Sequence, residues 1–423
     1  MSRTVLRLPL HVVAVYVLLC APGAVLTLLT PCNSSRSCSL NGACIGGACR
    51  CDQGWVGVYC QQLELLPVAN GTGLDCLHDS AALTSTWGGT ILHDSSSGIW
   101  HMWASEMLEH CGIHSWVQNS VVVHATADRA DGKYTRQEVV FEHFSHEPSA
   151  ARAPTGEFVL YITHNSDMNT SNPIGKCTDG SSGPCPSNGC HNGNCNWGRD
   201  PKKPLLQSCT MQTFMSYATN AAGPWSTLVP IPTIGPNPYA DLNFAPIIEA
   251  DGSLLGWTRD GIVRAKNWRN VSGYRLTGKP MADKHYDKTW GEDPFLWKDQ
   301  RRGGYHILSH GTNTGDDAGQ NQMDTIVECT PGSTVRGCQP GPEGDCGRHF
   351  FSETGSAGTW EAAPLPNKEN GGCSYWRMDI PFADGHNRTF WRRERPHLAI
   401  EADGTLAALT TGTMDRYRCC LPA

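Results

Sequence analysis

Acidic side chains recur beside prolines at the start of apolar runs, and such carboxylates could support acid–base chemistry. The clearest case is the Glu-Asp-Pro-Phe-Leu-Trp segment at residues 292–297, and similar phrases contain Glu147 and Glu394. One protonated and one ionised carboxyl group can act as general acid and general base. Neighbouring like charges raise the pKa of one group, as a general acid requires. The candidate catalytic residues are therefore Glu147, Glu292, Asp293 and Glu394.

β-Hairpins must position these acids, because each acid precedes a strand, a turn and a second strand. Five such units start near residues 87, 147, 243, 293 and 395. Proline suits the first residue of a strand, since it cannot donate a hydrogen bond to the ladder. Repeated hairpins with a shared start are typical of a β-propeller, whose inner strands converge on one axis. The sequence predicts an all-β fold with a five-bladed β-propeller over residues 83–423, and a generic β-sandwich is the alternative.

Composition restricts the compartment and the partners of the chain. The sequence has 423 residues, 20 cysteines and a formal charge of −7. This many cysteines indicates an oxidising compartment, so we expect a secreted, extracellular or lumenal protein. The negative charge provides no basic field to hold nucleic acid. Residues 1–30 are typical of a signal peptide, with an uncleaved membrane anchor as the alternative.

Six closely spaced cysteines predict a small disulfide-bonded module over residues 31–60, followed by a linker over 61–82. Spacing alone does not determine their pairing. The segment resembles an EGF-like module in this spacing and in the Gly-Trp-Val-Gly sequence at residues 54–57. The resemblance implies the pairs Cys32–Cys44, Cys38–Cys49 and Cys51–Cys60. For an isolated EGF-like module we expect a spacer or a weakly adhesive role.

The blades resemble those of glycoside hydrolase family 43 and its relatives, which are five-bladed propellers. The resemblance rests on Glu292-Asp293-Pro294 and on Gly223-Pro224-Trp225 after a third strand. It implies a carbohydrate partner and hydrolysis by two carboxyl groups, ~6.5–9.5 Å apart for inversion or ~5–5.5 Å for retention. It also allows a structural calcium ion on the propeller axis, and it implies no other cofactor. Family members usually place a base on the inner strand of the first blade, where this chain has Trp87-Gly88-Gly89, and an acid on the third, which begins Asn243-Phe244-Ala245.

Further side chains near the strand starts could contact a sugar, since tryptophan rings stack and histidine or arginine donates hydrogen bonds. Trp103, Trp116 and Trp257 are additional stacking candidates. Taken singly, each tryptophan is also explained by core packing and each histidine by a hydrogen bond at a strand end. The acids are also explained by ion pairs, with Arg393 or Arg395 for example. The predicted substrate-binding residues are Trp87, His146, Asn243, Arg259, Trp290, His310, Arg395 and His397.

Two cysteine-rich insertions, at residues 177–209 and 311–346, interrupt the predicted blades, and long loops commonly determine binding specificity. A zinc site is the alternative to disulfides at Cys190, His191 and Cys195. Sequons mark candidate glycosylation sites at Asn33, Asn70, Asn169, Asn270 and Asn387.

We predict a carbohydrate-active protein, with glycoside hydrolysis as the leading activity. A catalytically inactive carbohydrate-binding or adhesive protein is the alternative, favoured if an arginine caps each acid.

Overall fold

The structure is a computed structural model with an all-β architecture. Within the described residues, the 3-10 helices are η1 (Ser35–Cys38) and η5 (Val271–Gly273), and Trp116 is also helical. The described ranges are 32–74, 85–108, 116, 120–142, 144–164, 212–232, 243–258, 260–282, 292–310, 347–364, 379–389 and 392–414.

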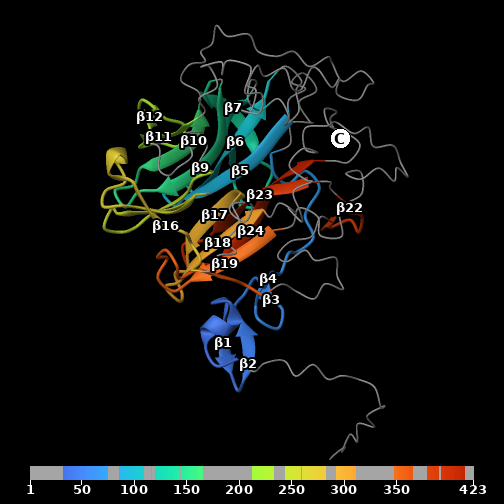
Figure 1. The fold of residues 1–423 in the computed structure, drawn as a ribbon. Coiled ribbons are helices and arrows are strands. Elements are labelled where there is room, and N and C mark those ends of the chain that lie inside the picture. The colour runs from blue at the N-terminus through green and yellow to red at the C-terminus, as the bar shows by residue number, and fades with distance from the viewer. Residues whose placement is uncertain are drawn as a thin grey trace, which may run out of the picture.

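Four antiparallel sheets of four strands are arranged radially, as in a propeller (Figure 1). In chain order they are β5 (Ser85–Asp94), β6 (Ile99–Met107), β7 (Ser120–Ala127) and β8 (Thr135–Phe141); β9 (Ser145–Arg152), β10 (Phe158–His164), β11 (Gln212–Ala218) and β12 (Val229–Pro230); β13 (Ala245–Ile248), β14 (Leu254–Thr258), β15 (Gly261–Ala265) and β16 (Arg275–Gly278); β17 (Glu292–Lys298), β18 (Tyr305–His310), β19 (Gly347–Ser352) and β20 (Glu361–Ala362).

The fifth predicted blade is a hairpin, β23 (Arg392–Ile400) and β24 (Leu406–Met414), which forms a two-stranded sheet. The first strands of the units follow one another around a closed ring in the order β5, β9, β13, β17 and β23, with β23 again beside β5. The prediction of five blades is therefore wrong for the described residues, which form four blades and one hairpin. The sequence repeat counts hairpins, and the fifth hairpin has no third strand paired with it among the described residues.

The hydrophobic core lies between neighbouring sheets, which explains why many strands read as nearly continuous apolar runs. Trp103 of β6 packs with Phe158 and Phe214 between the first two blades. Trp257 of β14 packs with Phe350 between the third and fourth blades. Both tryptophan side chains are completely buried. Burial of such aromatic area is the main force that holds the radial array together.

The N-terminal module has the three predicted disulfides, so the EGF-like pairing is confirmed. Its Trp55 is buried and stacks on Trp297 of β17, with the ring centroids 6.5 Å apart. The module is therefore packed against the fourth blade, and it does not stand apart as a spacer. Its strands are β1 (Gly42–Ile45), β2 (Ala48–Cys51), β3 (Trp55–Val56) and β4 (Gln62–Leu63).

The predicted linker is partly built into the structure. Its first residues form β4, which pairs with β3 of the module. Val68 then bridges to Phe382, beside the two-stranded sheet of β21 (Asp379–Pro381) and β22 (Asn387–Thr389). The linker segment thus contributes pairing partners to both parts of the molecule.

Several predictions fall outside the described residues: the leader, both cysteine-rich insertions with the zinc alternative, and the sequon at Asn169. Within the described ranges, no helix has the length and apolar character to cross a membrane. Four sequon asparagines are exposed, namely Asn33, Asn70, Asn270 and Asn387. Their glycosylation stays a prediction.

Candidate functional site

A repeated backbone irregularity marks the start of the inner strands. Five residues, one from each unit, have left-handed φ values between 44° and 56°: Gly88, Glu147, Asn243, Asp293 and Arg395. In every unit except the third, the pairing register shifts at this residue, as in a β-bulge. Bulges redirect side chains and tolerate proline, which follows three of the five residues.

The four non-glycine residues of this set contact one another, and we call Glu147, Asn243, Asp293 and Arg395 the axial cluster. Arg395 Nη1 lies 2.8 Å from Glu147 Oε1 and 2.7 Å from Asp293 Oδ1. Asn243 Nδ2 donates to Glu147 Oε2 at 3.3 Å, and Asn243 Oδ1 accepts from the Asp293 amide at 2.8 Å. The side chains of the three charged members are 7–13% exposed. Four different units thus each contribute one polar side chain to a single cluster.

Gly88 provides the space that Arg395 occupies. A Cβ atom added at Gly88 would lie 2.5 Å from Arg395 Cδ, closer than any real contact permits. The first blade also supports the cluster through Ser105, whose Oγ accepts a hydrogen bond from the Glu147 amide at 3.0 Å. The sequence pattern does not identify Ser105 as a site residue, because nothing distinguishes a single serine on a second strand from any other surface or core serine.

The two carboxylates of the axial cluster share one arginine. Glu147 Oε1 and Asp293 Oδ1 contact the same nitrogen, so they lie no farther apart than the sum of those two contacts. That separation is shorter than the ~6.5–9.5 Å between the carboxyl groups of inverting glycosidases. A guanidinium stabilises ionised carboxylates, whereas a general acid must carry a proton.

Two predicted binding histidines, His146 and His397, are buried beside the cluster. His146 Nδ1 lies 2.6 Å from Ser120 Oγ, and His397 Nε2 lies 3.2 Å from Thr90 Oγ1. Burial, together with the charge of Arg395, lowers the pKa of His146 well below its ordinary value, although Asp293 opposes this shift. Burial also lowers the pKa of His397 to about 3. Both rings are therefore neutral at pH 7, and their role in binding stays a prediction.

Trp116 combines partial exposure with a contact to the surroundings of the cluster. Its ring stacks on His146 with the centroids 5.0 Å apart and an interplanar angle of 28°. Trp103 and Trp257, by contrast, are core residues, and Trp87 is also buried. Trp116 is the stacking candidate that the described structure favours.

The remaining candidates are less completely placed. Glu394 is buried in β23 and lies opposite Gly412 of β24. Glu292 and His310 are paired residues of β17 and β18, and only their backbone is described. Arg259 and Trp290 lie outside the described residues. For none of these five does the structure place the side chain within the axial cluster.

The axial cluster does not fit the calcium ion that the family resemblance allows. Carboxylate oxygens are suitable calcium ligands. Arg395, however, already supplies a positive charge between the two carboxylates. Elsewhere in the described residues, three cysteine sulfurs lie close together at Cys32, Cys38 and Cys49, and all three belong to disulfides.

Comparison with known proteins identifies the N-terminal module. Residues 35–63 match the family model described as a Teneurin-like EGF domain. This match confirms the predicted EGF-like module, and such disulfide-bonded modules are typical of extracellular or lumenal proteins. No curated protein matches the chain by sequence.

The solved structures that are similar to this chain include three glycoside hydrolases. The catalytic domain of the family 62 α-L-arabinofuranosidase from Coprinopsis cinerea is 12% identical, with 83% of this chain and 92% of that chain covered and a TM-score of 0.44. A family 117 glycoside hydrolase from the marine bacterium Zobellia galactanivorans is 11% identical, with 77% and 79% covered and a TM-score of 0.41. A mutant of the family 43 protein BlXynB from Bacillus licheniformis is 10% identical, with 78% and 48% covered and a TM-score of 0.40.

Proposed function

We propose that this protein is an extracellular carbohydrate-binding protein whose ligand site is the axial cluster, and that the cluster recognises sugar without hydrolysing it. The observation that carries the proposal is the contact of Arg395 Nη1 with both Glu147 Oε1 and Asp293 Oδ1. Because one guanidinium holds both acids, neither carboxyl group is free to donate the proton that glycoside hydrolysis requires.

The cluster has the donors and acceptors that sugar hydroxyls need. Ionised carboxylates accept hydrogen bonds, the guanidinium and the Asn243 amide donate them, and such charge-assisted bonds are the stronger ones. Trp116, which stacks on His146, offers an aromatic face for a sugar ring. The left-handed backbone of four non-glycine residues also supports a functional role, because strain of this kind concentrates at functional sites.

Glycoside hydrolysis is the second candidate, and one observation favours it. Glu147 and Asp293 come from different blades and are close enough to be compatible with the ~5–5.5 Å separation of retaining enzymes. For hydrolysis, Arg395 would have to move away from one carboxylate, so that this group could take up a proton. Glu292 and Glu394 remain alternative acids in that case.

The test combines a glycan array and calorimetry with an activity screen on aryl glycosides and polysaccharides, all with the full chain. We expect the wild type to bind a glycan and to release no sugar. Glu147→Gln and Asp293→Asn should each weaken binding roughly tenfold or more, as expected for loss of a hydrogen bond to a charged group. Glu64→Gln is the control, because Glu64 is exposed and lies in the linker segment.

Two outcomes would contradict the proposal. Sugar release by the wild type that is lost in the Glu147→Gln/Asp293→Asn double variant would establish a glycosidase. Failure of the folded wild type to bind any glycan would exclude carbohydrate as the ligand of the axial cluster.

A further inference from the structure

The EGF-like module is held to the fourth blade by an aromatic contact. Trp55 lies against both Trp297 of β17 and His349 of β19, with ring centroids 6.5 Å and 5.0 Å away. Leu40 and Leu63 of the module belong to the same buried cluster. Apolar burial therefore dominates the centre of this interface.

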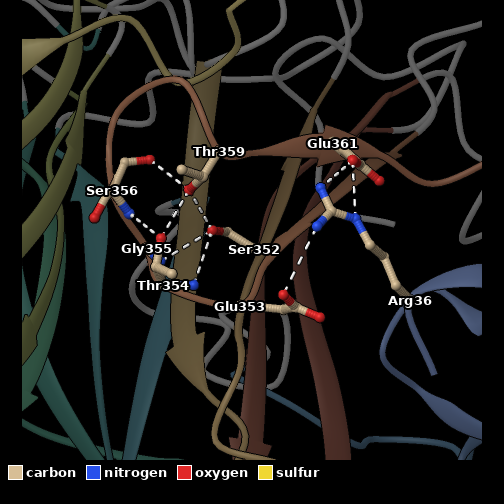
Figure 2. Close-up of polar contacts among 8 residues, drawn as sticks. All are labelled: Arg36, Ser352, Glu353, Thr354, Gly355, Ser356, Thr359 and Glu361. Atoms are coloured by element: carbon tan, nitrogen blue, oxygen red, sulfur yellow. Dashed lines mark hydrogen bonds and ion pairs between the residues drawn. The ribbon is translucent and has the colours of Figure 1, made fainter. Parts of the chain in front are cut away.

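Ion pairs lie around the aromatic contact. Arg36 of the module reaches Glu361 with its Nε at 3.0 Å and Glu353 with its Nη1 at 3.7 Å (Figure 2). Glu353 lies in a turn in which Ser352 and Thr359 are hydrogen-bonded at 2.6 Å (Figure 2). Arg302, in the turn between β17 and β18, binds both carboxylate oxygens of Asp52 at 2.7 and 2.8 Å.

His349, which contacts Trp55, forms a pair with His306. His306 Nδ1 and His349 Nε2 are 3.0 Å apart, and both side chains are buried. The His306 ring also stacks on Trp297 at 4.9 Å. One ring donates and the other accepts, and this hydrogen bond is lost when both rings are protonated, because two donors then face each other. His306 Nε2 has no hydrogen-bond partner among the described residues, so an added proton there would be a buried, unpaired charge.

The charged groups around the histidine pair do not offset the burial. Burial lowers the pKa of His306 to about 4; Asp299 and Asp52 oppose this shift, while Arg301 adds to it. Burial and the neighbouring His306 together lower the pKa of His349 well below its ordinary value. The faces of the tryptophan rings would attract a cation, but this attraction is smaller than the cost of burying the charge.

We propose that this interface is an acid-sensitive latch, in which protonation of the His306–His349 pair releases the EGF-like module from the fourth blade. Release opens the face under Trp55 to water, where a histidine regains its ordinary pKa of 6.5. Docking is therefore strongest above pH 6.5 and weakens as the pH falls towards 4. Moving the pKa of His306 alone from 6.5 to about 4 weakens docking roughly 30-fold at pH 5.

The experiment is hydroxyl-radical footprinting of the full chain at pH 7.5 and pH 5, with side-chain labelling measured by mass spectrometry and corrected for the effect of pH on the radical dose. We expect labelling of Trp55, which is buried at the interface, to be roughly 30-fold faster at pH 5, with buried Trp103 of β6 still protected. His306→Gln, which keeps hydrogen-bonding groups but does not titrate, should reduce this acceleration to a few-fold.

A second histidine pair in the same chain provides the matched control. His101 Nδ1 and His124 Nε2 are 2.9 Å apart in β6 and β7, and burial lowers the pKa of His101 to about 4 as well. This pair packs on Trp103 of the first blade, so His101→Gln should leave the acid release of the module unchanged.

Wild-type protein alone also tests the latch, in case His306→Gln fails to fold. Small-angle scattering should show a larger maximum dimension at pH 5 that reverses on return to pH 7.5, with the near-ultraviolet circular dichroism of the blades retained. Equal labelling of Trp55 at both pH values would overturn the proposal. Simultaneous exposure of Trp55 and Trp103 would also overturn it, since that is global acid unfolding.

Discussion

At the scale of single residues, the axial cluster depends on one arginine. Arg395 compensates two nearly buried carboxylates at once, and Asn243 links these same two residues by hydrogen bonds. Removing one member of a buried ionic group leaves the others uncompensated, which costs more than the intact group contributes. The cluster is therefore a structural unit as well as a candidate ligand site.

Replacing Arg395 should destabilise the fold strongly. We expect Arg395→Met to lower the free energy of unfolding by about 3–5 kcal/mol, because Glu147 and Asp293 would be left as uncompensated charges. Urea unfolding at pH 7 measures the change, and adding Glu147→Gln and Asp293→Asn should recover part of it. Arg129→Met removes an exposed ion pair with Asp131 and should have no measurable effect. Equal effects of the two arginine variants would contradict this account.

Gly88 is a second residue on which the axial cluster depends, because a larger side chain at this position would clash with Arg395. Gly88→Ala should lower the free energy of unfolding by about 1–3 kcal/mol, because the new Cβ atom combines a left-handed backbone with a clash against Arg395. Glycan binding should fall with it, as Arg395 is displaced. Gly98→Ala is the control, since Gly98 has φ 73° and no neighbour within 4 Å, so it bears the backbone cost of about 1 kcal/mol alone. Thermal unfolding and calorimetry of glycan binding distinguish the Gly88→Ala variant from the Gly98→Ala variant. Unchanged glycan binding in Gly88→Ala would count against the axial cluster as the ligand site.

At the scale of elements, the EGF-like module and the fourth blade share one buried cluster. Cys38, Cys60 and Trp55 of the module belong to the same cluster as Leu308 of β18 and Leu398 of β23. The module therefore also touches the two-stranded hairpin, the unit that lacks outer strands in the described residues. The docked module therefore stabilises the propeller body at neutral pH and does not behave as a separate, flexibly attached domain.

Truncating Trp55 should reveal this coupling. We expect Trp55→Ala to cost about 3–5 kcal/mol, the usual range for removing a large buried aromatic side chain. Differential scanning calorimetry should show one cooperative transition in the wild type and a lower, broader or split transition in the variant. Val58→Ala is the control, because Val58 is an exposed apolar residue of the same module. A Trp55→Ala midpoint equal to that of the control would mean that the module is not coupled to the blade.

At the scale of the whole molecule, buried histidines make stability depend on pH. Burial lowers the pKa of several histidines in different blades, to about 4 for His101 and His306 and to about 3 for His397. A histidine with a lowered pKa in the folded state binds a proton more readily when unfolded. Its stabilising contribution is complete above pH 6.5 and is lost as the pH falls towards the folded value.

The molecule should therefore be less stable in mild acid. We expect the urea midpoint to fall steadily between pH 7.5 and pH 5, with each buried histidine contributing on the order of 1–3 kcal/mol. A His101→Gln/His306→Gln double variant should show a shallower decline. A midpoint that is constant or rises over this range would contradict the burial of these rings.

The sequence by itself determined the features that depend on local pattern. Alternating apolar residues, turn glycines and prolines predicted an all-β chain of repeated hairpins, and cysteine spacing with a Gly-Trp-Val-Gly segment indicated the EGF-like module whose three disulfides the structure confirms. The positions of Glu147 and Asp293 at strand starts could also be predicted from the sequence, because proline marks those starts.

Only the tertiary structure decided which side chains at those strand starts contact one another. It determined that Arg395 lies between Glu147 and Asp293, that Trp103 and Trp257 are core residues, and that the fifth unit is a hairpin in the described residues. These facts depend on how sheets far apart in the chain close into a ring. Local pattern specifies each strand and its two faces, but it does not specify which charged side chains meet when the ring closes.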